Sequence, residues 1–403
     1  MNGQLPFLVL IAVVYTLQSI FGAITFQGMP AVLREAGVEP VKIGLIYLLM
    51  LPWVLKFLWA APIENWRKSH KNGTKKIFVF ANLIAIFSLT LLIFFDPKSD
   101  LTYILLLLAA VALLSSTVDI SLDGYAISVS RAQQKGWVNV MQIGGGYLGA
   151  IVGGGAFLML IGQIGWQYAI LLMALIVSAM LLFISLSSLQ KEEGEAQNYR
   201  PSLKSALLSR KLQLGMVVIV IAQIGLRLAQ GMAMPFFIDR GISLTQLGFI
   251  AVFGGSLISL LAVFLSGMWV NKKGPGQVLI CLLFVQLLIY LTYYVASAQV
   301  SLSLLQACGL LLVNSACAAA SFVALYTLMM SWTSSKQAGV DFSLLQCMDI
   351  AVALLAGMLS GALVQYWGYQ SYFLICCIAS SIALISLPFF KLVTANKLSE
   401  AVQ

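Results

Sequence analysis

LLLLAAVALLSSTVDISLDGYAISV, residues 105–129, is an apolar run that continues through two acidic residues. Asp119 and Asp123 are four residues apart, so both carboxylates project from one face of a helix. An acid near the middle of a bilayer costs about 2.5 to 3.5 kcal/mol on insertion scales. Two acids on one face therefore predict a polar cavity or a cationic partner beside them.

The composition of the 403-residue chain is that of a membrane protein. Hydrophobic residues make up 61% of it and charged residues 9%, and the mean hydropathy of +0.97 lies well outside the range of soluble domains. The formal net charge of +9 does not indicate nucleic-acid binding, because the chain has no basic soluble module. We predict a polytopic membrane protein whose basic residues mark one side of the membrane.

Twelve apolar segments are long enough, at about 20 residues each, to cross a bilayer as helices. They lie near residues 6–29, 42–63, 77–95, 101–128, 138–162, 166–188, 212–237, 246–270, 277–297, 301–331, 340–364 and 370–390. The first segment lacks the charged start of a cleavable signal peptide, so we expect it to remain as a span. The predicted fold class is an all-α polytopic membrane protein with twelve transmembrane helices.

Most lysines and arginines fall in alternate loops between these segments. The loop after the second segment alone carries Arg67, Lys68, Lys71, Lys75 and Lys76. By the positive-inside rule these loops are cytoplasmic. With an even number of spans, both termini are expected on the cytoplasmic side as well.

A polar linker at residues 189–211 divides the chain into an N-terminal half, residues 1–188, and a C-terminal half, residues 212–403. The halves repeat, since LREAGVEPVKIGLIY (33–47) resembles FIDRGISLTQLGFIA (237–251), and further matches occur at nearly the same offset. Halves with an even number of spans share one orientation in the membrane. This is the arrangement of the major facilitator transporters, which bind substrate between the halves near the midplane. We expect that fold, with two pseudo-symmetric six-helix halves.

Five ionisable side chains lie inside the predicted spans, namely Lys56, Asp119, Asp123, Arg227 and Asp349. Their depths allow Lys56 to pair with Asp119 or with Asp123, and Arg227 to meet Asp349. One hypothesis is that the two cations bind an anionic substrate while Asp119 and Asp123 relay protons. The alternative is that buried ion pairs lock helices together. Two acids exceed what one lysine neutralises, which favours the functional interpretation of the first cluster.

Neutral polar and aromatic side chains in the same spans extend the predicted site. The candidate substrate-binding residues are Lys56, Arg227, Tyr15, Gln18, Tyr125, Gln142, Tyr326, Gln346 and Asp349, and the candidate proton-coupling residues are Asp119 and Asp123. Amides, phenols and charges together suit a large polar ligand. Each neutral residue has an alternative role in interhelical hydrogen bonding, worth about 0.6 kcal/mol on average.

Residues for catalysis or metal binding are scarce. The single histidine, His70, lies in a basic loop, and the six cysteines fall in apolar segments without metal-ligand spacing. We therefore expect no enzymatic activity, no metal site and no cofactor. The glycine run GGGYLGAIVGGG (144–155) is expected to permit close helix packing, because it lacks the preceding strand and following Gly-Lys-Ser/Thr of a phosphate loop.

The loop APIENWRKSHKNGTKK (61–76) stands where many major facilitator proteins carry a gate motif with an acid followed by a base. The motif is degenerate here. Glu64 or Asn65 takes the place of the acid, and Arg67 or Lys68 takes the place of the base.

LPWVLKFLWAAPIE (51–64) and STVDISLDGYAI (116–127) resemble paired signatures of the muropeptide permease branch of the major facilitator superfamily. That branch includes shorter twelve-span bacterial permeases for siderophores such as pyochelin and rhizobactin. The resemblance marks Lys56 and the two acids of the fourth segment as functional. Val118 before the first acid, and twelve spans rather than more, differ from the muropeptide permeases and favour the siderophore permeases.

The expected function is secondary active transport by alternating access, in which protons drive the import of a siderophore or similar anionic metal-chelating metabolite across the bacterial inner membrane. The alternatives are a permease for muropeptides or other peptidoglycan fragments, or an exporter of the same fold. The expected partners are the small-molecule substrate, protons and the lipid bilayer, with no nucleic acid. We expect a monomer.

Overall fold

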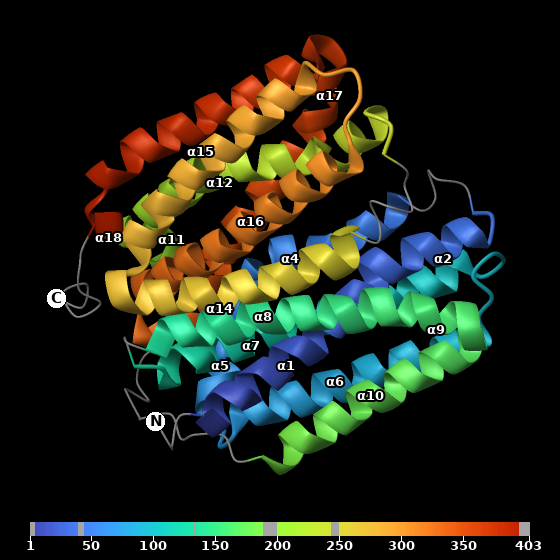
Figure 1. Ribbon diagram of the computed structural model, residues 1–403. Coiled ribbons are helices and arrows are strands. Elements are labelled where there is room, and N and C mark those ends of the chain that lie inside the picture. The colour runs from blue at the N-terminus through green and yellow to red at the C-terminus, as the bar shows by residue number, and fades with distance from the viewer. Residues whose placement is uncertain (1–4, 39–43, 132–133, 188–199, 243–249, 395–403) are drawn as a thin grey trace. The chain divides into compact units, whose positions relative to one another are not determined.

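The computed structural model describes residues 5–38, 44–131, 134–187, 200–242 and 250–394, and these residues form helices and turns without a β-strand (Figure 1). The chain forms two compact units. The first consists of the described residues within Met1–Ser130, Met141–Ala206 and Ser334–Leu344, and the second of those within Arg131–Val140, Leu207–Thr333 and Leu345–Gln403.

The first unit is built around four long helices that run alongside one another, α1, α6, α7 and α10 (Figure 1). Its elements are α1 (Leu5–Ala23), η1 (Ile24–Gly28), α2 (Met29–Glu35), η2 (Gly44–Met50), α4 (Leu51–Leu55), α5 (Phe57–Ser69), α6 (Gly73–Leu91), η3 (Leu92–Phe94), α7 (Leu101–Val129), most of α8 (Lys135–Ala150), η5 (Ile151–Ala156), α9 (Phe157–Ile164), α10 (Trp166–Leu186), most of α11 (Leu203–Leu208) and η7 (Ser335–Gln337).

In the second unit, α16 packs against α12, α14 and α15. The elements of this unit are α12 (Arg210–Asp239), η6 (Ile250–Gly255), α14 (Ser256–Lys273), α15 (Pro275–Ser297), α16 (Leu304–Trp332), most of α17 (Ala338–Ser386), η8 (Leu387–Phe389) and α18 (Lys391–Thr394). The first turns of α8 also belong to it, and the first turns of α17 belong to the first unit.

Nine helices in the described part of the chain are long and apolar enough to cross a membrane. The last, Ser335–Phe389, has 55 residues, or about 80 Å, which is enough for two spans, and its backbone turns at Gly368. The segments predicted at 42–63 and 246–270 consist of shorter helical pieces where they are described. Together these elements make up the expected twelve-helix fold.

Two glycine turns repeat between the halves. Gly165 (φ 81°) and Gly368 (φ 72°) each precede the last long helix of their half, within the matching sequences GWQ and GYQ. A Cβ at either position would meet no other atom within 4 Å, so the requirement for glycine comes from the left-handed backbone alone. The sequence repeat thus extends to local backbone geometry.

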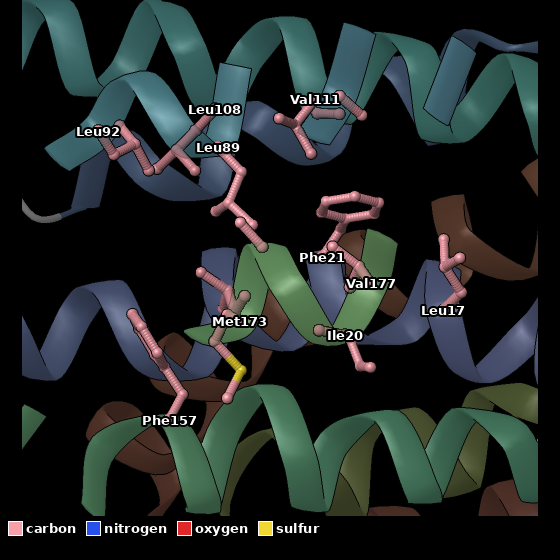
Figure 2. Close-up of a cluster of buried hydrophobic side chains, with 14 of the residues drawn as sticks. Leu17, Ile20, Phe21, Leu89, Leu92, Leu108, Val111, Phe157, Met173 and Val177 are labelled. Atoms are coloured by element: carbon pink, nitrogen blue, oxygen red, sulfur yellow. The ribbon is translucent and has the colours of Figure 1, made fainter. Parts of the chain in front are cut away.

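The core of the first unit is an apolar cluster contributed largely by α1, α6, α7 and α10, with further side chains such as Phe157 from the shorter elements (Figure 2). Phe21, Leu108 and Met173 come from three of these helices, and each is about 1% exposed. Because lipid tails are as apolar as leucine, such a cluster stabilises the bundle by close packing more than by removing side chains from water. This packing holds α7, and with it the two acids, in a fixed rotation.

The glycine run predicted to pack closely does so against α1. A Cβ on Gly153 would lie 2.4 Å from the carbonyl oxygen of Ile20, and one on Gly149 would lie 2.3 Å from Cβ of Ser19. The backbone of this run is a π-helix at η5, which contacts a second π-helix, η1, in the first span. Only glycine leaves enough space for this approach.

Of the two candidates for the acid of the degenerate gate motif, Glu64 and Asn65, Glu64 is the one that pairs with Arg67. Glu64 is fully buried and accepts two hydrogen bonds of 2.8 Å from Nε and Nη2 of Arg67. A Cβ on Gly124 of α7 would lie 2.7 Å from Oε2 of Glu64, and one on Gly339 of α17 would lie 2.6 Å from the same atom. Glu64 of α5 therefore lies close to the backbone of α7 and to the start of α17.

Candidate functional site

Lys56 lies at a break in the second span. α4 ends at Leu55 and α5 begins at Phe57, and Pro62 lies within α5. The backbone of Lys56 keeps helical angles (φ −55°, ψ −23°), and its carbonyl accepts a hydrogen bond from the N–H of Trp59, three residues on, so the helix is locally tightened at this point. The side chain of Lys56 lies inside the unit and is only 1% exposed.

The ammonium group of Lys56 contacts both acids of α7. Its Nζ lies 3.4 Å from Oδ2 of Asp119 and 3.8 Å from Oδ2 of Asp123. The sequence leaves open which acid pairs with the lysine, and in the structure both do. With both carboxylates ionised, this cluster carries one positive and two negative charges.

Three neutral donors complete this first cluster. Tyr15 OH and Gln142 Nε2 both donate to Oδ1 of Asp123, at 2.5 Å and 3.1 Å. Trp53 Nε1 donates to Oδ2 of Asp119 at 3.0 Å. We call these six residues the acid cluster: Tyr15, Trp53, Lys56, Asp119, Asp123 and Gln142. Its members come from α1, α4, the break before α5, α7 and α8.

The two acids differ in exposure. The side chain of Asp123 is fully buried, whereas that of Asp119 is 20% exposed. A buried carboxylate needs hydrogen bonds or a counter-ion to offset its lost hydration, and Asp123 has both. Of the two acids, only Asp119 therefore has a side chain that is partly exposed at the surface of the unit.

The second unit holds its own charged group, which we call the Arg227 cluster: Arg227, Phe322, Tyr326 and Asp349. Arg227 Nη2 lies 2.6 Å from Oδ2 of Asp349, and Tyr326 OH donates to the same oxygen at 3.1 Å. The guanidinium carbon of Arg227 lies 4.7 Å from the centroid of the Phe322 ring, which is cation–π geometry. This cluster is electrically balanced.

Each partner of this ion pair has one polar atom that makes no hydrogen bond in the described part of the chain. Within the described residues, Nε of Arg227 and Oδ1 of Asp349 are buried and make no hydrogen bond. Leaving such atoms unsatisfied costs about 1 to 3 kcal/mol each, more when the group is charged. The pair therefore retains one donor and one acceptor for a further polar group.

The remaining predicted residues lie outside these contacts. Gln18 donates to the backbone oxygen of Ser115 at 3.4 Å, which matches the alternative of interhelical hydrogen bonding. Tyr125 is buried and packs edge-on against Phe7, with ring centroids 6.4 Å apart. Gln346 is buried on α17, one turn before Asp349.

Two residues of these clusters are not among those the sequence predicts. Trp53 precedes Lys56 by three residues, which is the helical spacing that places two side chains on one face, so the sequence carried a signal for it. Phe322 lies one turn before Tyr326, but an apolar ring in an apolar helix carries no such signal. Only its position beneath Arg227 identifies it.

Comparison with known proteins agrees with this architecture. The sequence model of the Major Facilitator Superfamily matches residues 7–304 and 216–402. The AmpG 4 protein of Rickettsia felis is 22% identical, over 94% of this chain and 97% of its own length. The anhydromuropeptide permease of Escherichia coli K12 is 20% identical, over 91% of this chain and 76% of its own length.

Solved structures support the same fold. The E. coli fucose:proton symporter FucP superimposes with a TM-score of 0.71 at 12% sequence identity, covering 95% of this chain and 98% of the symporter. Identity this low supports the fold and says nothing of the substrate.

Proposed function

The chain belongs to the major facilitator superfamily, and within it we propose that the protein is a proton-driven permease that imports a peptidoglycan fragment, a muropeptide, across the bacterial inner membrane. The observation that carries this proposal is similarity along nearly the whole chain to a relative named as an anhydromuropeptide permease. The sequence signatures at residues 51–64 and 116–127 point to the same branch.

The siderophore interpretation favoured by the sequence has less support. It rested on Val118 before the first acid, on Glu64 and Asn65 after the second span, and on the short, twelve-span chain. The alignment with AmpG 4 of R. felis covers 97% of that protein, so a chain of this length also occurs among proteins of that name. Chain length therefore does not distinguish the two substrate classes. The alternative, muropeptide import, becomes the preferred proposal.

The Arg227 cluster suits a substrate that carries carboxylates. Muropeptides carry them on the peptide stem, next to a sugar with several hydroxyl groups. Arg227 keeps an unused donor at Nε, its side chain is 17% exposed, and a guanidinium binds carboxylates in a bidentate manner. We assign substrate recognition to Arg227, with Tyr326 and Asp349 holding its orientation.

Lys56 is a poorer candidate for the anion site than the sequence alone suggests. It is almost completely buried and already lies within 4 Å of two carboxylates. An incoming anion would have to displace both of them. We assign the acid cluster to proton coupling, with Lys56 as the counter-ion of the acids.

The test is transport by the purified protein in proteoliposomes with an imposed proton gradient. We expect accumulation of radiolabelled anhydromuropeptide, inhibition by a protonophore, and no accumulation of a labelled ferric siderophore. Arg227→Lys, which keeps the charge and loses the planar fork, should raise the KM for the muropeptide about tenfold or more, because one good charged hydrogen bond contributes about 1.5 to 3 kcal/mol.

Siderophore accumulation without muropeptide accumulation would overturn the proposed substrate. Equal accumulation with and without the protonophore would overturn proton coupling. Gln18→Leu is the matched control variant, because Gln18 bonds only to the backbone of α7 in the described residues and should leave the KM within about threefold.

A further inference from the structure

We propose that the two acids have separate roles, an inference that rests on the proposed proton coupling. Asp119 takes up and releases the proton, and Trp53 holds the Asp119 side chain in position. Asp123 remains ionised as the fixed counter-ion of Lys56. The assignment follows from which carboxylate oxygens are already occupied and which are accessible.

Asp123 has no accessible oxygen. Its side chain is fully buried, Oδ1 accepts hydrogen bonds from Tyr15 and Gln142, and Oδ2 faces the ammonium of Lys56 at 3.8 Å. Protonating Oδ1 would displace Tyr15 or Gln142, and protonating Oδ2 would remove the charge that the ammonium of Lys56 faces at 3.8 Å; in either case the proton would have to reach a side chain that is fully buried. The surroundings of Asp123 therefore favour one protonation state throughout.

Asp119 has one occupied and one open oxygen. In the described part of the chain, the hydrogen bonds from Trp53 and Lys56 both end on Oδ2, and the side chain is 20% exposed. A proton can therefore add to Oδ1, forming the carboxylic acid, while both contacts to Oδ2 persist. Loss of the same proton restores the carboxylate and needs no other co-reactant.

The charge balance of the cluster favours the same acid. With Asp119 ionised, one lysine faces two carboxylates. When Asp119 takes up one proton, Lys56 and Asp123 remain as a balanced pair. One proton thus converts a net negative cluster inside a membrane helix bundle into a neutral one, which is the lower-cost state in a low-dielectric medium.

Among the side chains that the structure describes, three charged or titratable groups face Asp119. They are Lys56 from the break between α4 and α5, Asp123 from α7 itself and Tyr15 from α1. α6, which packs along α7, carries its only charged residues, Lys75 and Lys76, in its first turn.

A second charged group, Glu64 of the gate motif with its basic partners Arg67 and Lys68, reaches α7 through Glu64. Glu64 approaches α7 at Gly124 and is paired with Arg67 at 2.8 Å and with Lys68 at 3.7 Å. With Lys68 included, this group carries one net positive charge, and it meets α7 at Gly124, about 7 Å along the helix from Asp119.

Trp53 is placed to hold Asp119 in this geometry. Its indole N–H donates to Oδ2 at 3.0 Å, and its ring packs edge-on against Phe26 with centroids 6.0 Å apart. A donor fixed by ring packing keeps Oδ2 occupied and so leaves Oδ1 as the oxygen that accepts the proton. Trp53 acts through Asp119, and we treat it as a positioning residue.

The experiment measures the acid directly and uses no substrate. Infrared difference spectra of the full-length protein in liposomes, recorded as pH is lowered, show the carbonyl stretch of any carboxylic acid that forms. We expect a band that is present in the wild type, absent in Asp119→Asn and retained in Asp123→Asn. A band that is lost in Asp123→Asn and retained in Asp119→Asn would overturn the assignment.

A matched pair of milder variants keeps the test informative if Asp123→Asn fails to fold. Trp53→Phe removes the donor to Asp119, and Tyr15→Phe removes a donor to Asp123, each with little change in shape. We expect Trp53→Phe to move the titration midpoint of the band and Tyr15→Phe to leave it unchanged. The reverse result would assign the proton to Asp123.

Failure of the proposed function would look different. If the substrate is not a muropeptide, uptake assays fail while the infrared band and its loss in Asp119→Asn are unaffected. If neither variant removes a band, the proton is not carried by the acid cluster and the present inference is wrong, whatever the substrate.

Discussion

Arg227 and Asp349 neutralise one another at 2.6 Å inside the second unit, and both are held by aromatic neighbours. Tyr326 donates to the carboxylate, and the ring of Phe322 lies against the guanidinium. A buried ion pair contributes little net stability compared with apolar residues of the same volume, but losing one partner is costly. The small net stability of such a pair is consistent with the ligand recognition that we propose for it.

This view predicts non-additive effects on stability. Arg227→Gln and Asp349→Asn should each lower the free energy of unfolding in mixed micelles by about 3 to 5 kcal/mol, because each leaves one buried charge unpaired. The double variant should lose less than the sum of the two, which a double-mutant cycle measures. Additive losses would show that the two side chains do not interact as the structure has them.

At the scale of elements, the close contact between the first and fifth spans depends on glycines, which have no side chain. η5 packs against α1 and η1, and at Gly153 the nearest atoms belong to the backbone of Ile20. A backbone cannot move aside as a flexible side chain can. π-helical segments are often found at functional sites, and two of them meet here.

We predict that Gly153→Ala destabilises the protein by about 1 to 3 kcal/mol through overpacking. The matched control is Gly162→Ala in α9, where the new Cβ meets nothing within 4 Å. This substitution should be neutral or slightly stabilising, because alanine is the better helix former. Thermal unfolding of both variants in detergent checks the difference, and equal melting temperatures would contradict the close contact.

At the scale of the whole molecule, the distribution of basic residues leads us to propose a cytoplasmic location for both termini. Lys68 binds the backbone oxygens of Ser335 and Lys336, so within the first unit two loops predicted to be cytoplasmic lie together. This agrees with the side assigned to them by the positive-inside rule.

Reporter fusions test this topology. A green fluorescent protein fused after Gln403 should fluoresce, and alkaline phosphatase fused at the same place should be inactive, because each reporter works on only one side of the membrane. The control is a fusion after Lys98, in the loop before α7, where phosphatase activity should be high. Active phosphatase at the C-terminus would reverse the proposed orientation.

The sequence by itself determined the helical membrane fold. Lipid offers no hydrogen bonds to a backbone, so an apolar run of about 20 residues must form a helix whatever its neighbours do. The repeat and the even number of spans then led to the major facilitator arrangement, and the cost of burying charge singled out Lys56, Asp119 and Asp123.

Only the tertiary structure decided how these charges are shared. The donors that separate Asp119 from Asp123 come from α1, α4 and α8, and Gln142 and Tyr15 reach the same oxygen from different helices. Such contacts depend on how each helix is rotated about its axis, which side-chain packing sets and hydropathy does not encode. The sequence therefore identified the two acids, and helix packing decided that both hydrogen bonds to Asp119 in the described part of the chain end on Oδ2.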